Sequence, residues 1–70
     1  MALSKGKLNT TYIVNAIKTA QDDMRDFLFT LGCYPGVEVT ILSKLANNYI
    51  INIKDARYSI DEQLASAIFV

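Results

Sequence analysis

The spacing of apolar residues changes from a helical period to a strand period in the middle of the chain. Between residues 22 and 31, the apolar side chains follow the i, i+3, i+4, i+7 spacing of one helix face, namely Met24, Phe27, Leu28 and Leu31. Further on, apolar positions alternate with polar ones, as in a half-buried strand, at Val37, Val39 and Ile41. The pattern predicts a helix over about 22–31 and a strand over about 37–45.

The residues from Leu31 to Gly36 separate these two patterns. Gly32 suits the left-handed conformation that commonly ends a helix. Pro35 and Gly36 suit the two central positions of a type II turn, where the second residue has a positive φ. We therefore expect Gly32, Pro35 and Gly36 to shape the turn, and backbone geometry explains them better than ligand binding does.

Segments rich in β-branched and aromatic residues predict four further strands. These strands cover about 10–18, 49–54, 57–60 and 67–70. Asn47 and Asn48 tolerate the positive φ of a tight hairpin, so we expect them to join the second strand to the third. Ser59 and Glu62 match the spacing of a capping box, which predicts a short helical turn over about 60–65.

Five short strands and one helix in 70 residues leave no room for the long crossovers of a parallel sheet. A small, strongly bent antiparallel barrel closes its own edges with this little chain. We therefore expect one mainly β domain over residues 1–70. Its core is small, and one cysteine without any histidine offers neither a disulfide nor a metal to reinforce it.

Charge and composition argue against several classes of function. Seven basic and seven acidic residues give zero formal charge, and no basic run is present, so we expect neither nucleic acid binding nor a basic membrane helix. No apolar run approaches the roughly 20 residues that span a bilayer. The first residues lack the apolar centre of a signal peptide, which together with a lone cysteine favours the cytoplasm.

The sequence also lacks the residue sets of common enzymes. Without histidine there is no Ser-His-Asp or Cys-His arrangement, and no phosphate-binding loop of the form G-x-x-x-x-G-K-[ST] occurs. The protein is therefore expected to be no enzyme and to need no cofactor.

Two features resemble metal sites at first sight. Cys33 is the only thiol, and its sequence neighbours supply no second soft ligand, so we interpret it as a packed apolar residue. Asp22, Asp23 and Asp26 are acidic neighbours, but complementing the positive end of a helix explains them more simply than cation binding does. Capping explains Asp61 and Glu62 in the same way. We predict no metal site.

Several short motifs follow one another along most of the chain: Leu31-Gly32, Pro35-Gly36, Val37-x-Val39-x-Ile41, Tyr58-x-Ile60 and Ala65-x-x-Ile68-x-Val70. Their order and spacing resemble the FeoA family of bacterial ferrous-iron transport accessory proteins. The resemblance implies an SH3-like barrel, a cytoplasmic location and a role beside FeoB, the membrane permease with a cytoplasmic GTP-binding domain. It brings no catalytic activity. The same barrel resembles the C-terminal domain of DtxR-type metal-dependent repressors, an interaction module.

Exposed aromatic residues are the best candidates for contact with a partner. Phe29 lies well over 100° around the helix from the apolar stripe, and Tyr34 lies in the loop that follows. Alternatively, Phe29 covers the N-terminal segment around Leu3. We take Arg25, Phe29 and Tyr34 as candidate partner-binding residues, because aromatic and arginine side chains anchor many protein interfaces.

Two functions remain open at this point. The first is an accessory protein that binds and modulates a FeoB-like permease. The alternative is a free-standing regulatory domain that responds to metal or binds a short proline-rich peptide. In either case, an unpaired edge strand can drive self-association.

Overall fold

The computed structural model describes all 70 residues and confirms a mainly β fold. Along the chain its elements are η1 (Leu3–Lys5, a 3-10 helix), β1 (Thr11–Ile13), β2 (Ala16–Ile17), α1 (Asp22–Thr30), β3 (Glu38–Leu45), β4 (Asn48–Ile53), β5 (Ala56–Asp61), α2 (Glu62–Ala67) and β6 (Ile68–Phe69). The predicted helix and the three central strands are therefore present, with ends that differ by no more than one residue.

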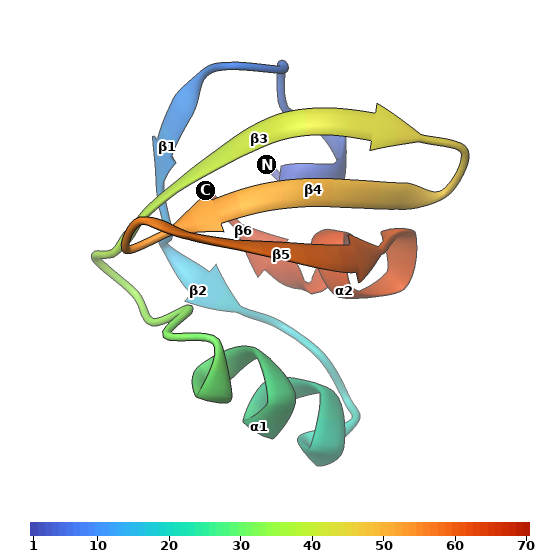
Figure 1. The fold of residues 1–70 in the computed structure, drawn as a ribbon. Coiled ribbons are helices and arrows are strands. Elements are labelled where there is room, and N and C mark those ends of the chain that lie inside the picture. Colours follow the sequence, from blue (N-terminus) through green and yellow to red (C-terminus); the bar gives the residue numbers. More distant parts are fainter.

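The strands form two antiparallel sheets. Strands β1, β3, β4 and β5 make a four-stranded sheet in that order, and β2 pairs with β6 in a two-stranded sheet. Figure 1 shows the large sheet curving over α2 and β6, while α1 lies at one end of the molecule beyond β2. This arrangement leaves most of the surface of α1 facing solvent.

The prediction of one strand over 10–18 was wrong, because the chain changes sheets in the middle of this segment. The backbone of Val14 pairs with the turn after α1: its N–H donates to the Val37 carbonyl, and its carbonyl accepts the Gly36 N–H. The next residue, Asn15, donates to the carbonyl of Phe69. The segment therefore becomes β1 and β2, and the fold has six strands where we expected five.

The alternation predicted for the central strands is confirmed. Val39 and Ile41 of β3 are fully buried, and so are Tyr49, Ile51 and Ile53 of β4. The register between β3 and β4 shifts between Ile41 and Ser43, which marks a β-bulge. Beyond the bulge the strand leaves the core, and Leu45 at the hairpin is 80% exposed.

The junction after α1 has the predicted turn chemistry. Gly32 has φ +87° and Gly36 has φ +93°, both in the left-handed region. The N–H of Cys33 bonds back to the carbonyl of Leu28, which closes the end of the helix. The N–H of Val37 bonds to the carbonyl of Tyr34 at 3.1 Å, as a turn centred on Pro35 and Gly36 requires.

The β3–β4 hairpin differs from the prediction in one detail. Ala46, with φ +55°, is the turn residue with a left-handed backbone, whereas we expected an asparagine there. Asn48 is instead the first residue of β4.

The capping box predicted at Ser59 was also wrong. Strand β5 continues to Asp61, and Asp61 is the N-cap of α2, with its carboxylate accepting the N–H of Leu64 at 2.8 Å. Ser59 lies within β5, opposite Ile50 of β4, so it cannot start a helix. The helix therefore covers Glu62–Ala67, about two residues later than predicted, and the last strand is shortened to β6.

The N-terminal segment is an integral part of the fold. Leu3 in η1 is fully buried, and η1 contacts both α2 and β6. The two chain ends are tied together, since the Met1 ammonium donates to the carbonyl of Val70 at 2.9 Å and Val70 N–H donates to the carbonyl of Met1 at 2.8 Å. We did not predict a structural role for this segment.

The core contains only apolar side chains. Its fully buried members are Leu3, Val14, Leu28, Cys33, Val39, Ile41, Tyr49, Ile51, Ile53, Ile60, Ala65, Ala67 and Ile68. From α1 only Leu28 is fully buried, whereas Phe27, which we placed in the core stripe, is 47% exposed. Because no polar side chain is buried, any recognition by this protein depends on groups at its surface.

Candidate partner-binding surface

The two aromatic residues singled out from the sequence lie against each other. Phe29, near the end of α1, stacks on Tyr34 with ring centroids 5.1 Å apart and an angle of 23° between the rings. Phe29 is half-buried by this contact, and Tyr34 remains 44% exposed. A stacked pair of this kind contributes about 0.5–1.5 kcal/mol beyond the area it buries, so each ring holds the other in place.

A lysine that is distant in the sequence, from the β4–β5 turn, completes this surface. The ammonium of Lys54 lies 5.5 Å from the centroid of the Tyr34 ring, within the range of a cation–π contact. Lys54 occupies the β4–β5 turn, where Lys54 and Asp55 both have positive φ. We call Phe29, Tyr34 and Lys54 the aromatic surface. Sequence reasoning missed Lys54, since it lies 20 positions beyond Tyr34.

Arg25, the third candidate, lies one helical turn before Phe29, and its side chain binds groups at the start of α1. Its guanidinium contacts the carboxylate of Asp22 at 3.2 Å and the carbonyl of Thr19 at 3.1 Å. These bonds anchor the chain at its entry into α1. Its side chain is still 38% exposed.

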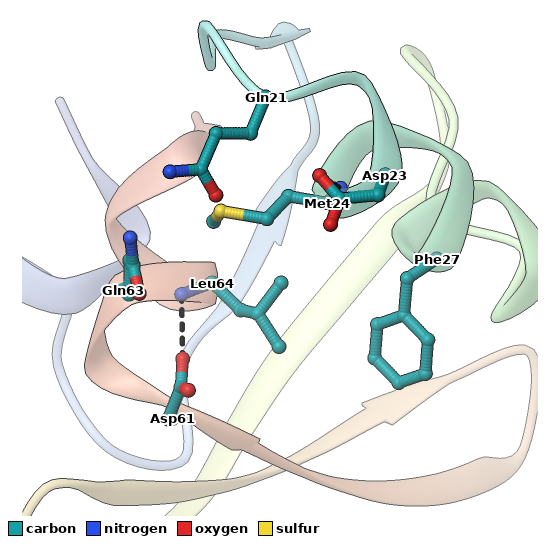
Figure 2. Close-up of a pocket in the computed structure, with 7 residues that line it drawn as sticks. All are labelled: Gln21, Asp23, Met24, Phe27, Asp61, Gln63 and Leu64. Atoms are coloured by element: carbon teal, nitrogen blue, oxygen red, sulfur yellow. Dashed lines mark hydrogen bonds between the residues drawn. The ribbon is translucent and has the colours of Figure 1, made fainter.

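A groove lies on a different face of α1. Its volume is about 250 Å³, and α1 and α2 form its two sides (Figure 2). The residues that line it are Gln21, Asp23, Met24, Phe27, Asp61, Gln63 and Leu64. Sequence reasoning missed this groove, because the helical spacing places Phe27 on the core stripe.

The chemistry of Cys33 agrees with its assignment as a packing residue. The thiol is fully buried, and burial raises its pKa from 9.0 to about 11. A thiol that holds its proton so strongly is a poor nucleophile and a poor metal ligand. No group of three or more His, Cys, Asp or Glu side chains is placed to hold a metal ion. The three aspartates of α1 and the thiol therefore do not combine into a metal centre.

None of the helices is long and apolar enough to cross a membrane. The structural features together define a small SH3-like β domain with an exposed helix. Comparison with known proteins assigns this domain to a family. The family model described as the FeoA domain matches residues 1–70, and the chain therefore belongs to the FeoA family.

Solved structures of similar fold include members of that family. An iron uptake regulatory protein (FeoA) is 25% identical, with a TM-score of 0.87 over 97% of this chain and 91% of that chain. The FeoA of Stenotrophomonas maltophilia, solved with zinc and described as a prokaryotic SH3 domain protein, is 23% identical, with a TM-score of 0.88 over 99% and 87% of the two chains. The predicted family and the SH3-like fold are both confirmed.

The same fold occurs inside a larger regulator. A manganese-dependent transcriptional repressor superposes with a TM-score of 0.92 and 21% identity, and the match covers all of this chain but only 40% of that chain.

Comparison with curated proteins finds no significant match. FeoA is a family of small accessory domains in ferrous-iron transport and is not known as an enzyme family.

Proposed function

We propose that this protein is a cytoplasmic accessory protein of bacterial ferrous-iron uptake, which binds the cytoplasmic portion of a FeoB-type membrane GTPase permease and modulates its activity. The family match to the whole chain supports the transport context. The observation that carries the contact is the stacked pair of Phe29 and Tyr34, held at the surface beside Lys54.

The aromatic surface has the properties of an interface anchor. Phe29 and Tyr34 present rigid apolar area, and their stacking reduces the conformational freedom that a partner would otherwise have to restrict on binding. Lys54 supplies a positive charge beside them, whereas the Arg25 guanidinium is paired with Asp22 one turn earlier on α1. Aromatic residues and arginine provide much of the binding energy in protein interfaces, whereas most of their neighbours only exclude water.

The test is a binding titration of the permease's soluble cytoplasmic domain with this protein. We expect Phe29→Ala/Tyr34→Ala to weaken binding at least tenfold, since two anchors that contribute about 2 kcal/mol or more are removed. Leu45→Ala is the matched control, because Leu45 is more exposed than either aromatic residue and lies at a distant hairpin. Equal affinity of the double variant and the wild type, both shown to be folded, would rule out this surface.

A second candidate function rests on the likeness to the repressor domain. In this alternative the chain is a free-standing regulatory domain that responds to metal or binds a peptide. The side chains present do not fit the metal-responsive version, because the chain has no histidine and its single thiol is buried. Anaerobic titration with ferrous, manganous and zinc ions separates the accessory role from the metal-responsive regulator: micromolar binding by the isolated protein favours the regulator, and its absence rules out the metal-responsive version.

A further inference from the structure

The groove between α1 and α2 has the size of a site for side chains. Its volume of about 250 Å³ is below the roughly 300–1,000 Å³ of typical small-molecule pockets. A second hollow of about 210 Å³ continues from it, since the two share Gln21, Met24 and Gln63. Most of the lining residues are exposed, so the groove is open along its length. This shape suits a chain segment that lays one or two side chains into it.

The floor of the groove is apolar and adaptable. Figure 2 shows Met24 and Leu64 facing each other between the two helices, with the ring of Phe27 at one side. Met24 and Leu64 are half-buried, and Phe27 is 47% exposed without being needed for the core. Methionine fills irregular spaces and is common at binding surfaces for that reason. An aliphatic side chain is the natural occupant of this floor.

Carboxylates flank the apolar floor. Asp23 and Asp61 lie on opposite sides of Leu64 in Figure 2, and neither forms an ion pair, since the only salt bridge of the molecule joins Arg25 to Asp22. Five of the seven acidic residues belong to this part of the molecule, at positions 22, 23, 26, 61 and 62. No basic residue lines the first hollow, so its rim is acidic, whereas the exposed Lys18 lines the second hollow.

We propose that this α1–α2 groove docks a basic amphipathic segment of a partner protein, with an apolar residue on Met24, Leu64 and Phe27 and lysine or arginine residues facing Asp23 and Asp61. The Phe27 ring adds a face on which a guanidinium can lie. The occupant is inferred from charge complementarity: both carboxylates would repel an acidic segment, and neither has a cationic partner within the chain, so a basic segment would supply one.

This site is separate from the aromatic surface. Phe27 and Phe29 are two residues apart on α1, which places them about 200° apart around the helix. The chain's own basic and apolar pair, Lys44 and Leu45, is a poor substitute for a partner, because the Lys44 ammonium already lies 5.2 Å from the centroid of the Tyr49 ring. The partner that we propose for this groove therefore need be neither the permease nor a second copy of this chain.

The test uses two synthetic helical peptides, one of leucine and lysine with leucines at i, i+3 and i+4, and one with every lysine replaced by glutamate. Each is titrated into the isotopically labelled full chain, and amide chemical shifts are followed. We expect the basic peptide alone to bind, with shifts centred on Met24, Phe27 and Leu64. Asp23→Asn/Asp61→Asn should weaken binding at least tenfold, while Asn at position 61 still caps α2.

Asp55→Asn is the matched control, since Asp55 is an exposed acid in the β4–β5 turn and asparagine accepts its positive φ. Its affinity for the basic peptide should stay within twofold of the wild type. Three results would overturn the proposal: equal binding of the acidic peptide, an equal loss in Asp55→Asn, or groove shifts that depend on protein concentration without peptide. The last result would assign the groove to a second copy. All three leave the permease titration unaffected.

Discussion

The buried thiol of Cys33 makes the stability of this protein depend on pH in a predictable way. Its pKa is raised from 9.0 to about 11 in the folded state by burial, and it returns to the lower value on unfolding. The unfolded chain therefore loses this proton first as the pH rises. The stabilisation is complete below pH 9 and is lost as the pH approaches 11.

The magnitude follows from the two pKa values. A two-unit difference corresponds to about 3 kcal/mol when the thiol is ionised in both states, and about half of this is already lost at pH 10. A 70-residue domain has a free energy of unfolding of only a few kcal/mol, so this loss is a large part of the total.

To isolate the contribution of the thiol, the experiment compares the wild type with Cys33→Ala. Denaturant unfolding is measured for both at pH 8 and pH 10. At pH 8 we expect the variant to be less stable by about 1 kcal/mol, because it loses buried volume. At pH 10 this difference should fall to about zero or reverse. A constant difference between the two proteins at both pH values would show that the thiol is not desolvated.

The remaining predictions concern single contacts of the fold. Leu3→Ala should reduce the free energy of unfolding by about 2–5 kcal/mol and leave the domain largely unfolded at 37 °C, as thermal denaturation would show, because this side chain is fully buried. Asp61→Ala should reduce the free energy of unfolding by about 1 kcal/mol through loss of the α2 cap, whereas Ser59→Ala should change the unfolding midpoint little. A larger loss of stability in Ser59→Ala than in Asp61→Ala would show that Ser59 caps the helix. Gly36→Ala should cost about 1 kcal/mol from backbone strain alone, since no atom lies within 4 Å of the added methyl group.

The parts of the fold predicted correctly are those whose signal is local. In β4, one face lies on the core, so the buried residues Tyr49, Ile51 and Ile53 alternate with polar or half-exposed ones. This alternation can be read from the sequence alone. Gly32 and Gly36 are likewise recognisable, because each backbone conformation depends on its own residue. Such elements need no knowledge of distant neighbours.

The errors occur where distant residues decide the local structure. Residues 10–18 have strand propensity throughout, but Val14 pairs with the turn after α1 and Asn15 with β6, and these partners divide the strand. At the start of α2, both Ser59 and Asp61 can cap a helix, and the pairing of Asp61 with Asn48 decides between them by extending β5. Propensity could not distinguish these outcomes.

The candidate surface was only partly accessible from the sequence. Phe29 and Tyr34 are close along the chain, so their proximity could be inferred from the helix and the turn between them. Lys54 reaches Tyr34 because the β4–β5 turn lies at the same end of the molecule as the α1 loop, and no short-range pattern encodes that.

The exposed faces of α1 explain why a helix is retained in so small a β domain. A helix of nine residues is too short to be stable alone, so α1 depends on contacts with the rest of the domain. These are the buried side chain of Leu28, the hydrogen bonds that close the helix end at Gly32, and the hydrogen bond from Arg25 to the Thr19 carbonyl at the helix start. These anchors leave Phe27 and Phe29 on different faces, one in the groove and one in the aromatic stack. Neither ring is fully buried, and the core contains neither phenylalanine. The proposed functions use these two aromatic faces for recognition, so we expect Phe27→Ala and Phe29→Ala to affect binding before they affect folding.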